Sequence, residues 1–333
     1  MSVVLNAPHD HARHFEPGHP ERPDRVDAVL AGVGDLDLGD DLIVAPARVA
    51  TRAELLAVHD EAYIDDLGVF CYSGGGDIDP DTYANYSSWT VAQNAAGAGL
   101  SVVAEMATRE DAVGLIATRP PGHHATRDRA MGFCLLNNIA VCAAALAGAG
   151  ERVLIVDWDV HHGNGTQEIF WDDPRVLYAS IHQWPLYPGS GAAHEVGGEH
   201  APGLTLNVPL PPKATGDVAR AAFESLIAPA AQRFEPTWVL VSAGYDAHRA
   251  DPMADLSWSA GDFAGLARDV AGVAPRTGRV AFFLEGGYDL DALRASAAAT
   301  LGAVLGVDAG GEAPTSGGPG VDQVARAGSE RLA

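Results

Sequence analysis

Residues 152–166 read RVLIVDWDVHHGNGT, and this stretch indicates the fold most directly. Its first part, Arg152–Val156, is short and almost continuously apolar, as expected of a strand buried on both faces of a parallel sheet. Acidic and imidazole side chains follow at once, from Asp157 to His162. Because ligands of open α/β sheets bind beyond the carboxyl ends of the strands, the stretch predicts a strand that delivers functional groups to a site.

Four more apolar runs have the same character, and Ala-rich stretches of helical length separate them. The runs are Ala112–Ala117, Arg175–Ser180, Trp238–Ser242 and Arg279–Leu284. The helical stretches are Ser87–Ala107, Asn138–Ala149, Asp217–Phe234, Ser259–Val273 and Asp289–Val307. This alternation predicts an α/β fold in three layers, with a central, mostly parallel sheet flanked by helices.

Polar residues with catalytic potential follow these four runs as well. The segments read PPGHH (120–124), HQWPLYPG (182–189), AGYDAH (243–248) and EGGYD (285–289). Packing alone does not explain why five strand ends supply His, Asp, Tyr and Gly to one edge. We therefore expect the active site at the carboxyl ends of the strands.

The composition is that of a globular protein with a large core: 333 residues, 47% hydrophobic and 20% charged, with a formal net charge of −23. Such an acidic chain lacks the clustered cations that bind nucleic acids or anionic membranes, so neither is an expected partner. The acidity fits a well-solvated or salt-adapted surface, or attraction of cationic substrates. With no internal repeat or linker, we expect one domain over residues 1–309, and a mobile or loosely docked low-complexity tail over 310–333.

Cysteine usage and the N-terminus point to a reducing compartment. Cys71, Cys134 and Cys142 are too few for a disulfide framework, and no CxxC pair is present. Cys134 and Cys142 lie in an apolar stretch and are expected to be core residues. The N-terminus lacks the pattern of a signal peptide, and no apolar run is long enough to cross a bilayer. The sequence therefore predicts a cytoplasmic location.

Asp159 and His161 form a candidate metal site, because side chains two apart in an extended segment point the same way. Asp246, at another predicted strand end, could supply a third ligand. Two carboxylates and one imidazole leave an open coordination position, as in catalytic divalent metal sites. The alternative is structural: Asp157 and Asp159 would cap the following turn, and His161 would be a loop histidine.

His123 and His124 follow a Pro-Pro-Gly turn and could both face a cleft. Asp157 is the natural partner for one ring, whose basicity it would raise, and Asn164 could keep the other ring neutral. A neutral imidazole can act as general base toward water, and a cationic one can protonate a leaving amine. Considered alone, such a pair is more often a surface feature of a loop.

Aromatic side chains offer an oxyanion donor and a channel. Tyr288 follows two glycines that permit a close backbone approach, and its phenol could donate to a developing oxyanion. Gly132-Phe133 and Tyr187 could form the walls of a narrow slot for a thin alkyl chain. Each aromatic residue, taken separately, could equally be a packing residue.

The remaining histidines have no spacing typical of metal ligands. Four of them are expected in loops or in support of the site: His182, His194, His200 and His248. Four more, near the N-terminus, are expected in a loop at its rim: His9, His11, His14 and His19.

Several motifs, taken in order, resemble the zinc-dependent histone deacetylase superfamily. The likeness is to its class II-like branch, with bacterial deacetylases, acetylpolyamine deacetylases and acetoin utilization proteins. The motifs are GHPERP (18–23), RPPGHHA (119–125), MGFC (131–134), NN (137–138), DWDVHHGNGT (157–166) and EGGY (285–288). The resemblance extends from about His9 to Val307, and it implies the arginase-deacetylase fold with one Zn²⁺, for which Fe²⁺ can substitute in some relatives.

The resemblance also implies a role for each candidate residue. The metal ligands would be Asp159, His161 and Asp246. The catalytic residues would be His123 and His124, backed by Asp157 and Asn164, with Tyr288 as oxyanion donor and His124 as proton shuttle to the amine. The acyl-lysine channel would be lined by Gly132, Phe133 and Tyr187. A structural K⁺ or Na⁺ would be held, largely by main-chain oxygens, at Asp157, Asp159, His161, Ser180 and Ile181. No second aspartate follows His161 as in binuclear manganese ureohydrolases, so arginase-like chemistry is not expected.

The reaction implied by the resemblance is hydrolysis of an N-acetylated amine to acetate and the free amine. The substrate could be an acetyl-lysine protein or peptide, an acetylpolyamine or a small acylated metabolite. Arg249, close to Asp246 in the sequence, would disfavour a polycation. A pseudo-enzyme that binds acylated amines without turnover is the non-enzymatic alternative, and a homo-oligomer is compatible with the sequence.

Overall fold

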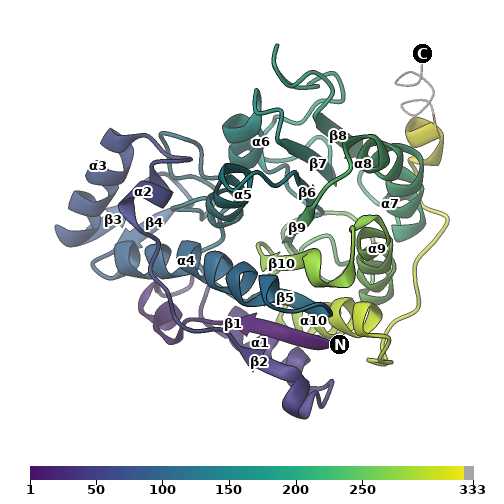
Figure 1. Ribbon diagram of the computed structural model, residues 1–333, viewed down its shortest axis with the longest axis horizontal. Coiled ribbons are helices and arrows are strands. Elements are labelled where there is room, and N and C mark those ends of the chain that lie inside the picture. The colour runs from purple at the N-terminus through teal and green to yellow at the C-terminus, as the bar shows by residue number, and fades with distance from the viewer. Residues whose placement is uncertain (326–333) are drawn as a thin grey trace.

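An eight-stranded sheet forms the centre of the computed structural model, which describes residues 1–325 (Figure 1). The strand order is β2-β1-β5-β10-β9-β6-β7-β8, and all neighbouring strands are parallel. In that order the strands span Leu42–Val44, Ser2–Asn6, Ala112–Ile116, Val280–Leu284, Trp238–Ala243, Val153–Asp157, Val176–Gln183 and Thr205–Leu210. A small antiparallel pair, β3 (Gly75–Asp77) and β4 (Tyr83–Asn85), lies apart from this sheet.

The five predicted strands are β5, β10, β9, β6 and β7, which are adjacent in the centre of the sheet. Their carboxyl ends therefore meet at one edge, as expected. β7 extends to Gln183, so His182 lies within a buried strand and not in a loop. Strands β1, β2 and β8, which lie toward the sheet's edges, were not predicted. β8 contains Pro209, whose missing N–H suits an edge strand.

Helices cover both faces of the sheet and complete three layers. On one face, α1, α9 and α10 contribute Val26, Phe263 and Leu293 to a buried apolar cluster. On the other face, α4 and α5 contribute Ala92 and Ile139 to a second cluster. The helices are α1 Asp24–Gly34, α2 Arg52–Leu55, α3 Glu61–Tyr72, α4 Ser88–Ala107, α5 Asn138–Gly148, α6 Asn164–Phe170, α7 Gly216–Ala222, α8 Ala228–Phe234, α9 Ala260–Val273 and α10 Leu290–Leu305.

Side-chain caps fix where the helices near the site begin. Asn137 precedes α5 and accepts from Ala140 N at 3.0 Å, and Asp289 precedes α10 and accepts from Ala292 N at 2.9 Å. The predicted helix over 217–234 is interrupted by a π-helical turn, Phe223–Ile227, between α7 and α8. The turn ends just before Pro229, whose missing N–H cannot join the regular helical ladder.

The segment 310–325 of the predicted tail is docked on the domain, which is the second of the two alternatives expected for it. Glu312 accepts from His248 Nε2 at 2.7 Å, and Thr315 Oγ1 donates to Asp262 at 2.7 Å. Val324 is buried at the end of the segment. These contacts could not be predicted from the low-complexity sequence, because single side chains make them. Residues 326–333 of the predicted tail lie outside the described residues.

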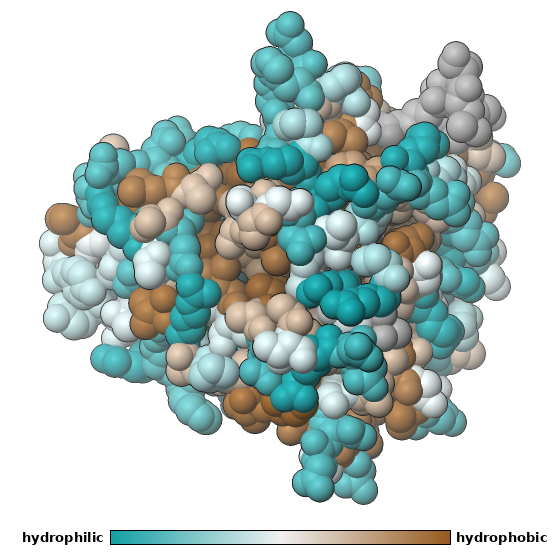
Figure 2. Space-filling view, in the orientation of Figure 1, coloured by the Kyte–Doolittle hydropathy of each residue, from teal (hydrophilic) through white to brown (hydrophobic). Residues whose placement is uncertain are grey.

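Polar and apolar residues are unevenly distributed over the molecular surface. On the face shown in Figure 2, hydrophilic residues dominate the periphery and apolar residues gather around a hollow near the middle. Across residues 1–325, no helix is both long and apolar enough to cross a membrane. Cys71, Cys134 and Cys142 are free and buried, and for Cys134 and Cys142 this was expected.

Candidate active site

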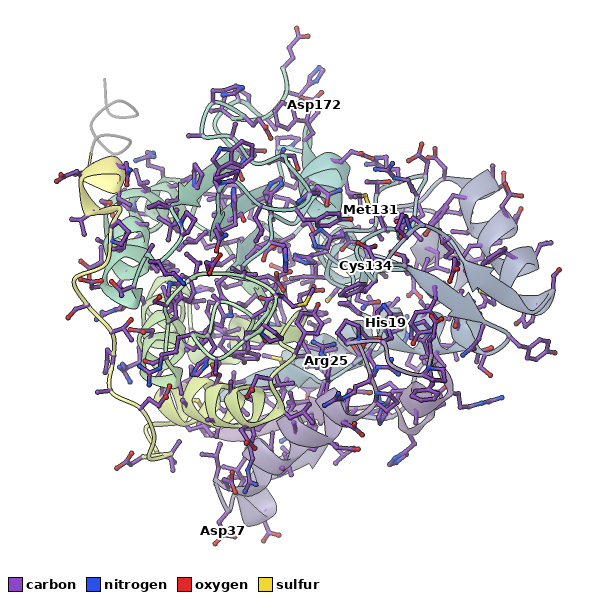
Figure 3. All side chains as sticks on the ribbon, turned by 180° about the vertical axis from the view of Figure 1, so that it is seen from behind. His19, Arg25, Asp37, Met131, Cys134 and Asp172 are labelled. Carbon is purple, nitrogen blue, oxygen red and sulfur yellow. The ribbon has the colours of Figure 1, made fainter. Side chains whose placement is uncertain are left out.

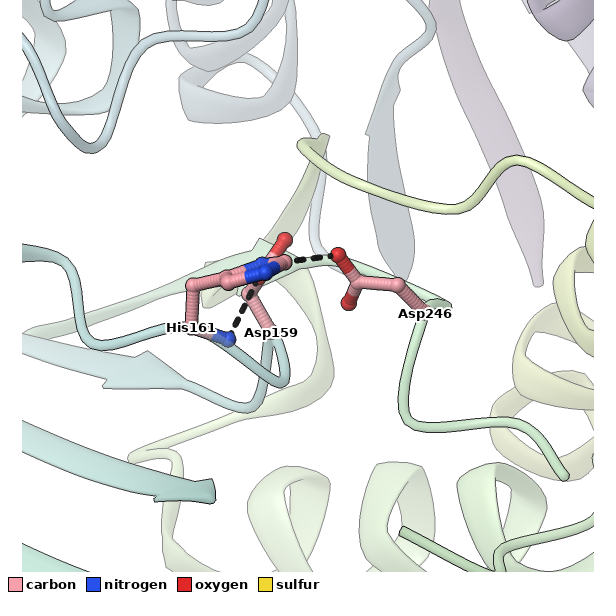
Figure 4. Close-up of side chains that lie close together, drawn as sticks. All are labelled: Asp159, His161 and Asp246. Atoms are coloured by element: carbon pink, nitrogen blue, oxygen red, sulfur yellow. Dashed lines mark hydrogen bonds and ion pairs between the residues drawn. The ribbon is translucent and has the colours of Figure 1, made fainter. Parts of the chain in front are cut away.

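Asp159, His161 and Asp246 meet at the carboxyl ends of β6 and β9 (Figure 4). His161 Nδ1 lies 3.1 Å from an oxygen of each carboxylate, and the three ligand atoms are all within 4.8 Å of one another. Gly286 makes room for this group, since a Cβ there would lie 2.1 Å from Asp246 Oδ2. The structure thus brings together three residues that the sequence places up to 87 positions apart.

The donor chemistry of this group fits a divalent cation. Two carboxylate oxygens and an imidazole nitrogen suit Zn²⁺ or Fe²⁺. Burial, followed by the neighbouring carboxylate of Asp159, raises the pKa of Asp246 to about 7. Two buried carboxylates side by side repel each other, and a bound cation would offset that cost.

The tandem histidines lie beside the metal-site residues, each with its own partner. His123 Nδ1 lies 3.1 Å from Asp157 Oδ2, and His124 Nδ1 lies 2.8 Å from Asn164 Oδ1. Burial favours a neutral ring at both positions. At His123 this is outweighed by Asp159 and Asp157, which raise its pKa to about 10. At His124, burial and the neighbouring His123 and His161 hold the pKa well below its usual value.

Tyr288 approaches the same group from the carboxyl end of β10. Its backbone N–H donates to Asp251 Oδ2 at 2.6 Å, and the Arg25 guanidinium lies 4.9 Å from its ring centroid. Burial, more than any neighbouring charge, raises the pKa of Tyr288 well above its usual value. The phenol therefore keeps its proton at neutral pH and can donate a hydrogen bond.

Aromatic rings surround the approach to this group. Tyr187 packs edge-on against His124 at 5.1 Å between centroids, and Phe133 packs edge-on against Tyr288 at 5.8 Å. Gly132 must be glycine, because a Cβ would lie 2.4 Å from the His124 ring. The ring centroids of His19 and Phe133 lie 4.7 Å apart, which places His19 at the predicted rim of the active site (Figure 3).

The residues of the predicted monovalent-cation site are adjacent in the sheet. Asp157, at the end of β6, pairs with Ser180 of β7, and Ile181 follows it. Asp159 and His161 continue from the same strand end. The cation itself stays a prediction.

Comparisons with known proteins identify the family. The profile of the histone deacetylase domain matches residues 19–304. The chain belongs to the histone deacetylase family. It is similar to "Histone deacetylase 10, chloroplastic" of Oryza sativa subsp. japonica, with 40% identity over 88% of this chain and 71% of the relative. A "Probable deacetylase" of Archaeoglobus fulgidus is 36% identical over 83% of this chain and 78% of the relative.

A solved structure of this family has the same fold. The crystal structure of the HDA15 HD domain superposes with a TM-score of 0.89 at 34% identity and covers 100% of this chain and 95% of that chain. The three-layer arginase-deacetylase fold is therefore confirmed. Membership in a family of deacetylases supports hydrolytic deacetylation as the reaction of the site.

A buried ionic cluster behind the site was not predicted as functional. Arg119 forms a two-pronged contact with Glu21, at 2.7 and 2.6 Å, and Arg25 contacts the same carboxylate at 3.1 Å. Arg25 Nε also donates to Gly287 O at 2.6 Å, one residue before Tyr288. The cluster thus ties the segment that carries the GHPERP motif (18–23) to the tyrosine turn, residues 286–288. The i,i+4 spacing of Glu21 and Arg25 was the available signal.

Replacing Glu21 by Gln should destabilise the fold by about 3–5 kcal/mol, because it leaves two buried guanidinium groups without their shared carboxylate. Urea unfolding followed by circular dichroism measures the loss. Glu61→Gln, which removes an exposed partner of Arg52, is the matched control and should have little effect. Equal losses in both variants would contradict a structural role for the buried cluster.

Glu285 is a second residue whose role the sequence did not reveal, although it lies in a quoted motif. Its buried carboxylate accepts from Gly122 N at 2.7 Å, His123 N at 3.1 Å and Ser242 Oγ at 3.1 Å. It therefore fixes the backbone from which both histidines project. Burial, opposed by the charge of His123, raises its pKa to about 7.

The other histidines divide into buried and exposed groups. His14 is buried, stacks on Tyr83 and lies 2.6 Å from Ser88 Oγ, so its assignment to a rim loop was wrong. Local sequence gave no sign of this because Tyr83 and Ser88 belong to a distant segment. His248 is buried against Glu312. His194 and His200 are exposed, as expected of loop residues.

Stability should fall as the pH drops from about 6.5 toward 4, with His59 as a main contributor. His59 Nδ1 lies 2.8 Å from Thr126 O, and Nε2 accepts from Asn137 N, so the buried ring is neutral. Burial lowers its pKa to about 4. Between pH 6.5 and 4 the His59 imidazole binds a proton in the unfolded chain but not in the folded one. This difference lowers the free energy of unfolding by up to about 3 kcal/mol.

Denaturation midpoints between pH 4 and 8 measure this effect. The variant His59→Gln keeps an acceptor and a donor but cannot titrate. Its midpoint should depend less on pH than that of the wild type. An unchanged dependence would assign the acid sensitivity to other groups.

Proposed function

We propose that the chain is a zinc-dependent amidohydrolase that removes acetyl groups from N-acetylated amines, acetyl-lysine foremost, and releases acetate. One observation carries the proposal: the Asp159–His161–Asp246 group is flanked by two histidines and a tyrosine under a slot with aromatic walls. Fe²⁺ could occupy the same donors. A structural K⁺ or Na⁺ beside β6 and β7 is part of the proposal.

The metal group and the tyrosine would act on the acetamide carbonyl. Asp159, His161 and Asp246 would hold the divalent ion, which supplies Lewis acidity toward the carbonyl oxygen and water. Tyr288 would donate its phenolic hydrogen to the oxygen as negative charge develops there. Arg25 and Asp251 would keep the tyrosine turn in place through their backbone contacts.

His123 and His124 would take part in proton transfer from the attacking water to the leaving amine. His124 uses Nδ1 for Asn164, which leaves Nε2 to accept a proton from the attacking water and then pass it to the amine nitrogen. His123, with Asp157 behind it, would hold a positive charge next to the reacting atoms. Phe133 and Tyr187 would exclude bulky groups and bulk water from the alkyl chain.

The choice of substrate rests on charge and channel shape. A net charge of −23 and a narrow aromatic slot both favour a cationic chain that ends in an acetamide. The sequence-based argument that Arg249 would repel a polycation loses its force, because the Arg249 guanidinium is paired with Glu312. An acetylpolyamine is therefore the second candidate.

Turnover of three substrate classes tests the proposal: acetyl-lysine peptides, N-acetylated polyamines and small acetamides. The purified protein loaded with Zn²⁺ should release acetate fastest from the peptides. No acetate release from any of the three would refute the hydrolase assignment.

A further inference from the structure

A second pocket lies next to the active-site slot, between α3, the β3–β4 hairpin and the loop 128–130. Its volume is about 480 Å³, which is within the range of ligand sites in proteins. Tyr63, Leu67 and Phe70 of α3, together with Ile78 and Ala130, give it an apolar lining. The pocket is thus suited to the aliphatic part of a long side chain.

The same pocket carries a surplus of negative charge. Arg129 is the only basic residue in its lining. The lining also contains four aspartates: Asp60, Asp66, Asp77 and Asp128. Asp66 and Asp77 are exposed, and within the part of the chain that the structure describes neither carboxylate has a hydrogen bond or ion pair. Their charges are therefore free to attract a cation.

The wall of the pocket is also the wall of the slot. The segments 77–82 and 128–133 contribute Ile78 and Ala130 to the pocket, and Phe133 to the slot. They are joined where Phe133 N donates to Thr82 Oγ1 at 3.1 Å. Asp77 of the pocket also lines a neighbouring hollow with Asp79, Asp81 and His19, and the His19 ring packs against Phe133 of the slot, so acidic groups extend from the pocket toward the slot.

We propose that this pocket binds a lysine or arginine side chain of an acetylated polypeptide whose acetyl-lysine occupies the slot. The inference rests on the proposed function and narrows its substrate class to basic polypeptides. Long basic side chains combine an aliphatic stem with a terminal charge, which matches an apolar lining with acidic groups at its edge. A linear acetylpolyamine in the slot has no second branch that could reach the pocket.

Peptides that carry one acetyl-lysine and a single Arg, scanned over three positions on either side, test the proposal against matched peptides with Gln. At one or two positions, Arg should raise kcat/KM by roughly fivefold over Gln. The gain should shrink at high salt, since a partly exposed charge pair is screened. In the double variant Asp66→Asn/Asp77→Asn the gain should disappear, while turnover of the N-acetyl-lysine monomer stays unchanged.

Two further variants separate binding in the pocket from a general charge effect. Asp40→Asn/Asp41→Asn makes the same change in charge at exposed positions of a distant turn and should keep the Arg preference. Ala62→Trp fills the pocket without a change in charge and should abolish the preference. Equal losses in the Asp40/Asp41 and Asp66/Asp77 variants, or an unaltered preference in Ala62→Trp, would overturn the proposal.

Two further measurements test the proposal: turnover of an N-acetylated polyamine, and the affinity for the Arg and Gln peptides. If Asp66→Asn/Asp77→Asn slowed an N-acetylated polyamine as much as the Arg peptide, the polypeptide assignment would be wrong. Titration calorimetry with the Arg and Gln peptides measures the pocket without turnover. Even if the wild type hydrolysed no acetamide, and the proposed function failed, tighter binding of the Arg peptide would support the pocket and equal binding would refute it.

Discussion

Deacetylation by this chain is expected to stop when the divalent ion is removed with a chelator, and to return when Zn²⁺ is added. The fall should be on the order of 10³-fold or more, because polarisation of the acetamide and activation of water both depend on the ion. The buried Asp159, His161 and Asp246 group is the only cluster of metal-ligating side chains found within residues 1–325. Acetate release and metal content, measured on the same samples, follow both changes.

Substitution of one ligand tests the location of the ion. Asp246→Asn should lower metal content and turnover together, because an amide oxygen is a weaker ligand than a carboxylate. Asp172→Asn, on an exposed carboxylate at one edge of the molecule in Figure 3, should change neither. If Asp246→Asn kept full metal and full turnover, the ion would have to bind elsewhere.

Tyr288→Phe is expected to lower kcat by about 10²–10³-fold with little change in KM, since the hydroxyl matters most when negative charge develops on the carbonyl oxygen. The phenyl ring keeps its packing against Phe133 and the Arg25 guanidinium, so the fold should stay intact. Steady-state kinetics and circular dichroism measure the two properties.

Tyr86→Phe is the matched control for the loss of a hydroxyl, because Tyr86 is exposed and lies outside the group of residues around the slot. Its turnover should equal that of the wild type. Wild-type turnover in Tyr288→Phe would remove the oxyanion role from this tyrosine and leave that role to the divalent ion that Asp159, His161 and Asp246 would hold.

The central strands could be predicted because burial on both faces leaves a direct mark on a sequence. A strand such as Val153–Asp157 must be apolar at every position, and polar residues can begin only where the strand leaves the core. Asp159 and His161 share a face for a local reason, their spacing along an extended chain. The edge strands β2 and β8, and β1 next to β2, were not predicted.

Contacts between distant segments could not be predicted, because no local rule selects their partners. Arg25 meets Gly287 across 262 positions, and Glu21 meets Arg119 across 98. Burial of Glu21 or of Arg119 would be too costly without the opposite charge beside it. Each of these residues, considered alone in the sequence, is typical of a polar surface. The docking of Glu312 on His248 was hidden in the same way by a low-complexity segment.

The sequence by itself determined the five central strands, the helical stretches between them, the edge of the sheet where the site forms and the types of side chain delivered there. It could do so because periodicity and strand-end chemistry are local properties. Only the tertiary structure decided that Asp246 lies within reach of His161, that Glu285 holds the histidine backbone and that an acidic pocket borders the slot. These features depend on the packing of segments far apart in the chain, which is set by the whole core and not by any one stretch.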